Sequence, residues 1–104
     1  MDDHPGVLFR DGPAGRRATV VGGPDVWEVV RAVKAARAAE PEMSDDELLT
    51  MVTDNTGVDR HMMRIALDYW SAYPDEVDAL VEHAERAERE GAAASERTRS
   101  LIGR

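Results

Sequence analysis

The sequence predicts a mainly α-helical protein that has a short N-terminal β-hairpin and a central helix-turn-helix. Apolar residues recur at helical spacing in four stretches between residues 25 and 91. Capping residues, glycines and prolines separate these stretches. Two short apolar runs also flank a segment rich in glycine and proline near the N-terminus. A chain of 104 residues fits one domain.

The predicted hairpin joins residues 7–10 to residues 16–21 through the turn-forming segment Asp11-Gly12-Pro13-Ala14-Gly15. A first helix follows, from near Pro24 or Asp25 to about Ala39, and Pro41 ends it. Its apolar stripe consists of Val26, Val29, Val30, Val33 and Ala36.

The next two helices have clear capping signals. Ser44 and Glu47 form a capping box at the start of the second helix, and Gly57 suits the left-handed residue that ends it. Asp59 caps the third helix, which runs to about Tyr73. This spacing of two helices around a glycine turn is typical of a helix-turn-helix.

Pro74 starts or kinks the next helical segment, which we expect to extend to Gly91, so that residues 1–90 form the folded domain. Residues 91–104 contain only Leu101 and Ile102 as large apolar side chains. We therefore expect a flexible C-terminal tail.

The net charge of −8 argues against simple nonspecific attraction to nucleic acid. Residues 40–90 carry four basic and fifteen acidic side chains, a net charge of −11, between mildly basic ends. The chain has no cysteine, no apolar run that could span a bilayer and no signal-peptide pattern at its start, so we expect a cytoplasmic protein. Because a small domain with few aromatic residues gains stability by burying surface in a partner, we also expect a homodimer.

The third helix offers a candidate surface for double-stranded DNA. Arg60, His61 and Arg64 lie near its N-terminal end, where a recognition helix contacts base edges in the major groove. The alternative is an ordinary helical hairpin whose polar face is solvated. Asp68 and the acidic preceding helix favour that alternative, because they repel phosphates.

Arg16 and Arg17 in the hairpin could act as a wing that grips the DNA backbone. Alternatively, they protect an exposed strand edge from aggregation.

The C-terminal segment is a candidate binding site for a partner protein, with Arg97, Arg99, Leu101 and Ile102 as the contacting residues. Alternatively, it is a passive terminus.

Catalytic patterns are absent from the sequence. His4, His61 and His83 lie too far apart along the chain to share a metal at helical spacing, and no serine stands in a nucleophile motif. Gly22-Gly23-Pro24 lacks the glycine pattern and the lysine of a phosphate-binding loop. We therefore expect no enzymatic activity, no cofactor and no metal site.

Residues 15–84 resemble the family of small bacterial proteins known as the domain of unknown function numbered four hundred and thirty-three. The similarity rests on Ala66-Leu67-Asp68-Tyr69-Trp70, on the acidic pair and valine at Asp75-Glu76-Val77, and on Gly15-Arg16-Arg17, where Arg16 replaces the usual threonine. The resemblance implies a winged-helix-like fold, dimerisation, and a role as antitoxin and autorepressor in a two-gene module.

The leading hypothesis is therefore a dimeric helix-turn-helix protein of the antitoxin type, which represses its own promoter and binds a toxin or other partner protein. The alternative is an acidic protein–protein adaptor that does not bind DNA.

Overall fold

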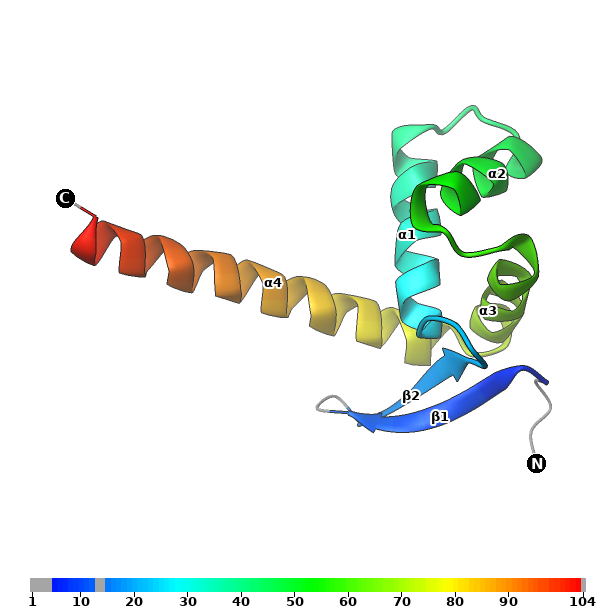
Figure 1. Ribbon diagram of the computed structural model, residues 1–104, viewed down its shortest axis with the longest axis horizontal. Helices are drawn as coiled ribbons and strands as arrows, with labels where there is room; N and C mark the ends of the chain where they lie inside the picture. The colour runs from blue at the N-terminus through cyan, green and yellow to red at the C-terminus, as the bar shows by residue number, and fades with distance from the viewer. Residues whose placement is uncertain (1–4, 13–14, 104) are drawn as a thin grey trace.

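The computed structural model describes residues 5–12 and 15–103 and shows a mainly helical fold preceded by a two-stranded antiparallel sheet (Figure 1). The elements in chain order are β1 (Val7–Gly12), β2 (Gly15–Val20), α1 (Val26–Ala39), α2 (Asp45–Thr56), α3 (Arg60–Ala72) and α4 (Pro74–Ile102). The predicted fold class is confirmed.

The hairpin pairs Val7 with Val20 and Arg10 with Arg17. β1 is longer than the predicted run and continues to Gly12, whereas β2 begins and ends one residue earlier than predicted, at Gly15 and Val20. The turn residues Pro13 and Ala14 lie outside the described residues. The sheet packs beneath α1 and α3 through Val7, Ala18 and Val20 (Figure 1).

One apolar core joins the hairpin to all four helices. Its largest fully buried side chains come from β2, α1, α3 and α4: Val20, Val26, Val30, Met63, Tyr69 and Val77. Leu48 and Val52 are the buried residues of α2. Burying this side of each amphipathic helix places the polar side of α3 at the surface.

The caps that the sequence predicts are present, with one difference. The Glu47 amide donates to Ser44 Oγ at 3.2 Å, and the Met62 amide donates to Asp59 Oδ1 at 2.8 Å. However, the Glu47 carboxylate accepts from the Ser44 hydroxyl, at 3.1 Å, rather than from the Ser44 backbone amide.

The fourth helix does not end at Gly91. It continues to Ile102, so α4 has 29 residues and is about 44 Å long. Alanine, glutamate and arginine are strong helix formers, and one interior glycine costs only about 1 kcal/mol, which is not enough to end the helix.

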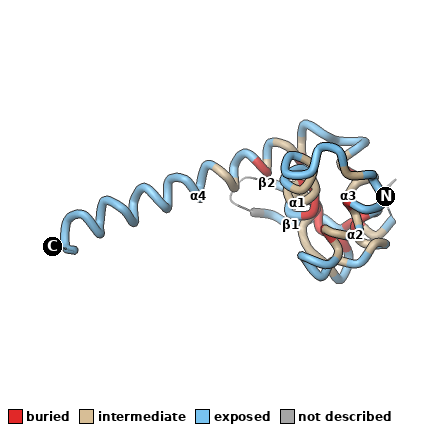
Figure 2. The backbone as a smooth tube through the Cα atoms, turned by 90° about the horizontal axis from the view of Figure 1, so that it is seen from above, coloured by how far each residue is buried: buried red, intermediate tan, exposed pale blue. Residues whose placement is uncertain are grey.

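Only the first part of α4 packs against the rest of the protein. Val77 and Val81 are buried, whereas every residue from Arg86 to Ile102 is exposed. This projecting part, residues 86–102, extends away from the other helices in two perpendicular views (Figures 1 and 2). It gives the molecule its elongated shape, with extents of 53 × 36 × 23 Å. Whether residues 91–104 are flexible stays a prediction.

Candidate functional site

The helix-turn-helix is formed by α2, α3 and the three residues between them. Gly57 caps α2 in the left-handed conformation, with φ of 78°, and its amide donates to the Thr53 carbonyl oxygen at 2.9 Å. Asp59 then caps α3. The glycine therefore separates two short helices, as the sequence predicts.

Arg60 is held by the preceding helix. Its Nη2 atom lies 2.9 Å from Asp46 Oδ1, and its Nη1 atom donates to Thr50 Oγ1 at 3.0 Å. Both terminal nitrogens of the Arg60 guanidinium, which could otherwise donate to a DNA base, are thus engaged with α2. The ion pair joins residues that are 14 positions apart and lie on different helices, so no local sequence pattern predicts it.

His61 and Arg64 have the exposure that the DNA-binding hypothesis requires. Both side chains lie at the surface of α3, and neither makes a hydrogen bond or ion pair within the described part of the chain. Asp68 and Ser71 are exposed on the same helix. The basic character of this face therefore depends mainly on Arg64.

The hairpin arginines contact other elements. Arg16 lies with its guanidinium carbon 4.0 Å from the centre of the Phe9 ring and with Nη2 3.5 Å from Glu76 Oε1 in α4. Arg17 Nε lies 2.6 Å from Oδ2 of Asp25, the residue that caps α1.

These contacts separate the five predicted DNA-binding residues into two groups. Arg60, His61 and Arg64 lie towards the N-terminal end of α3. Arg16 lies beside Glu76, just beyond the C-terminal end of α3, which is a helix of 13 residues and about 20 Å. The fold therefore does not bring all five residues together in one cluster, and their role in DNA binding stays a prediction.

A buried tyrosine supports the Arg16–Glu76 contact. The Tyr69 hydroxyl donates to Glu76 Oε2 at 2.6 Å, and its side chain is almost completely buried. Burial raises the pKa of Tyr69, and the hydrogen bond to the Glu76 carboxylate raises it further. Sequence reasoning missed this cluster because Arg16 and Glu76 are 60 residues apart.

Ion pairs attach α4 to α1 as far along α4 as Glu88, which lies at the start of the projecting part. Lys34 Nζ lies 2.8 Å from Asp78 Oδ1, which also accepts from Trp70 Nε1 at 2.9 Å. The hydrogen bond from Lys34 lowers the pKa of Asp78, and the hydrogen bond from Trp70 adds to this effect. Arg31 pairs with Glu88 and, at 3.7 Å, with Glu85, and its hydrogen bond lowers the pKa of Glu88.

From Arg86 to Ile102, α4 buries no side chain. Leu101 is 80% exposed and Ile102 is 73% exposed. Arg97 is exposed, and Arg99 pairs only with Glu96 on the same helix among the described residues. All four predicted partner-binding residues therefore lie together at the free end of the projecting part.

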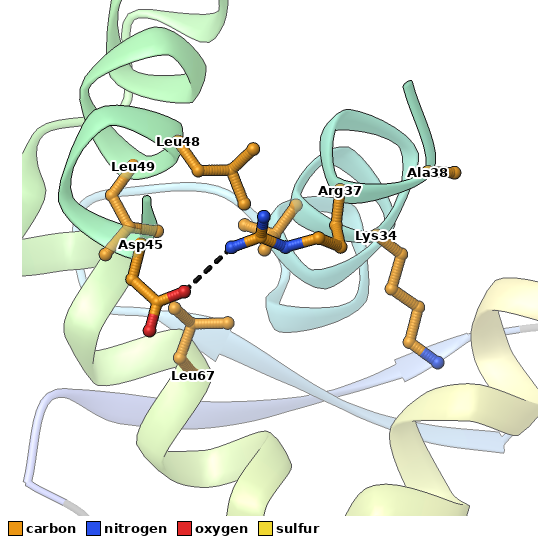
Figure 3. Close-up of a pocket in the computed structure, with 8 residues that line it drawn as sticks. Lys34, Arg37, Ala38, Asp45, Leu48, Leu49 and Leu67 are labelled. Carbon is orange, nitrogen blue, oxygen red and sulfur yellow. Dashed lines mark hydrogen bonds and ion pairs between the residues drawn. The ribbon is translucent and has the colours of Figure 1, made fainter. Parts of the chain in front are cut away.

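A pocket of about 560 Å³ lies between α1, α2 and α3. Arg37 of α1 reaches to Asp45 of α2, where Nη2 and Oδ1 are 2.7 Å apart (Figure 3). The remaining lining is mostly apolar and consists of Val33, Lys34, Ala38, Leu48, Leu49 and Leu67. Asp45 and Asp46 are thus both paired with arginines of this chain, which lowers the negative charge that α2 can offer to a basic partner.

Residues 5–12 and 15–103 contain no group of three or more His, Cys, Asp or Glu side chains that could hold a metal ion. No helix in this part of the chain is long and apolar enough to cross a membrane. Comparisons of the chain with models of protein families, with curated proteins and with solved structures give no match. The resemblance to the bacterial family in the sequence analysis stays a prediction.

Proposed function

We propose that this protein is a non-enzymatic, cytoplasmic binding protein of the antitoxin type, which holds a partner protein through the projecting part of α4. One observation carries the proposal: residues 86–102 form a helix that is exposed along its whole length and ends in two exposed large apolar residues.

A helix in this state gains stability when a partner covers it. Most helical stability in proteins comes from packing an apolar side, and residues 86–102 have no buried side chain in this structure. Leu101 and Ile102 supply apolar anchors, and Arg97 and Arg99 supply charge beside them. This combination suits a helix that docks into a groove of a partner.

Co-purification with the product of the adjacent gene tests the proposal. The variant Leu101→Asn/Ile102→Asn removes the apolar anchors. The matched control Ala92→Asn/Ala93→Asn places the same two side chains about two and a half turns away, on the opposite side of α4. We expect recovery of the partner to fall at least tenfold with the first variant and to stay within twofold with the second. Equal recovery with both variants would overturn the proposal.

A second candidate function, binding to promoter DNA, is favoured by the exposed and unengaged Arg64 and His61. Because Arg60 is already paired with Asp46, Arg64 is the arginine available to a base edge. A lost bidentate contact to guanine costs about 1–3 kcal/mol.

Fluorescence anisotropy with the upstream promoter tests this candidate. We expect Arg64→Ala to weaken binding about tenfold or more, in line with that cost. We expect the control Arg86→Ala, which removes an equal charge from the exposed surface of α4, to have a much smaller effect. Equal effects of the two variants would mean that any affinity is nonspecific.

A further inference from the structure

A stripe of residues follows one side of the projecting part at alternating steps of four and three. It consists of Ala87, Gly91, Ala94, Thr98 and Leu101, all of which are exposed. This is the spacing of the inner positions of a coiled coil, where two helices pack side by side. The half-buried Ala84 continues the stripe towards the rest of the protein.

The small residues in this stripe allow a second helix to approach closely, at the short end of the usual 8–10 Å between helix axes. Leu101 at the free end is the large residue of the stripe and is 80% exposed. A helix that runs in the opposite direction would bring its own Leu101 next to Ala84, which pairs a large side chain with a small one.

The charges beside the stripe favour an antiparallel copy of the same helix. Glu90 and Arg97 occupy equivalent flanking positions, one heptad apart, and both are exposed. In an antiparallel pair, these flanking positions of the two helices lie on the same side of the helix–helix interface. Glu90 of each copy would therefore lie near Arg97 of the other. In a parallel pair, Glu90 would instead face Ser95, and Arg97 would face Ile102.

We propose that the projecting part also binds a second copy of this chain, paired antiparallel along the stripe. Ala87 then lies opposite Thr98, and Gly91 opposite Ala94. The proposal rests on the proposed function to the extent that both assign binding to the projecting part of α4. It gives a dimer in which the two globular parts lie at opposite ends of a paired helical rod.

Sedimentation velocity over a range of protein concentrations tests this pairing. Ala94→Glu places a charge in the stripe of both copies, whereas Ala93→Glu places the same charge outside the stripe, about 100° around the helix axis from Ala94. Both alanines are exposed in the single chain, so neither variant removes a packing contact of the fold. We expect a wild-type dimer whose dissociation constant rises at least tenfold in Ala94→Glu and less than twofold in Ala93→Glu. A wild-type monomer, or equal shifts in both variants, would overturn the proposal.

Cysteine cross-linking tests the direction of pairing, since the chain has no cysteine of its own. An equimolar mixture of Ala87→Cys and Thr98→Cys chains should form the mixed disulfide dimer on mild oxidation, while neither variant alone should cross-link. Cross-linking of each variant with itself, and no mixed product, would show parallel pairing and overturn the antiparallel arrangement.

The two proposals fail in different ways. A monomeric chain whose adjacent-gene partner is lost in Leu101→Asn/Ile102→Asn would overturn the pairing and support the proposed function. A dimer that depends on Ala94, with partner recovery unchanged by the removal of Leu101 and Ile102, would overturn the proposed function and support the pairing.

Discussion

Gly57 determines, at the scale of a single residue, how α2 and α3 meet. Its φ of 78° lies in the left-handed region, and there is open space around the position where a Cβ would be added. A substitution at this site therefore changes the backbone energy and not the packing.

We expect Gly57→Ala to lower the free energy of unfolding by about 1 kcal/mol, because alanine is strained in this conformation. Gly57→Asn should cost less, since asparagine tolerates the left-handed region better than alanine does. Urea denaturation of the three proteins measures the difference. An alanine variant as stable as the wild type would contradict the assigned turn.

Tyr69 links stability to alkaline pH. Its pKa is raised in the folded protein, first by burial and then by the hydrogen bond to Glu76. The unfolded chain releases this proton near pH 10, whereas the folded chain retains it. The stability that results is complete below about pH 10 and is lost as the pH rises towards the pKa of the folded state.

Removal of the Tyr69 hydroxyl should therefore flatten the alkaline part of the stability curve. We expect Tyr69→Phe to be less stable than the wild type near neutral pH by about 1–2 kcal/mol, because a buried hydrogen bond to a carboxylate is lost. Above about pH 10 the gap between the two proteins should narrow. Urea denaturation at a series of pH values measures the difference in free energy of unfolding between the two proteins. A difference that grows as the pH rises would contradict the role assigned to the Tyr69 hydroxyl.

At the scale of the elements, the contact between α1 and α3 forms the centre of the core. Ala66 of α3 has no exposed surface, and Val29 and Val30 of α1 are buried in the same cluster. A larger side chain at position 66 has no space unless the helices move apart.

We expect Ala66→Leu to lower the free energy of unfolding by about 1–3 kcal/mol through overpacking. The control Ala79→Leu adds the same volume at an exposed position of α4 and should change it by less than about 0.5 kcal/mol. Chemical denaturation distinguishes the two. Equal stability of both variants would show that α1 and α3 do not pack as described.

The sequence was most informative about elements whose signals are local. Ser44, Gly57 and Asp59 mark their helix ends because each acts on backbone groups within four residues. The pairs Arg60–Asp46 and Arg16–Glu76 could not be predicted in this way, because their partners meet only after the chain folds. Both contacts engage an arginine that the sequence analysis assigned to DNA binding.

The prediction that the fourth helix ends at Gly91 was wrong, although the relevant signal is local. The C-terminal segment's shortage of large apolar residues indicated a tail, but its alanine, glutamate and arginine content favours a helix without tertiary packing. The spacing from Ala87 to Leu101 was present in the sequence and could have indicated a coiled-coil surface.

At the scale of the whole molecule, the structure divides into a globular part with a shared core and a projecting helix with exposed sides (Figure 2). The globular part should fold without the second half of the helix, because no residue after Val81 is buried among the described residues.

A chain that ends after Glu90 should therefore unfold in urea with a free energy within about 0.5 kcal/mol of the full chain, at a protein concentration low enough to keep both monomeric. Its helical circular dichroism signal per molecule should fall in proportion to the number of helical residues removed. A loss of more than about 1 kcal/mol would mean that residues 91–104 support the globular core.

Hydrogen exchange of the amides in residues 91–102 tests the central claim most directly, because an exposed single helix opens easily and a covered one does not. The account predicts fast exchange in the isolated chain at low concentration and strong protection of the same amides once the partner is bound. Unchanged exchange in residues 91–102 within a stable complex would contradict the assignment of binding to the projecting part of α4.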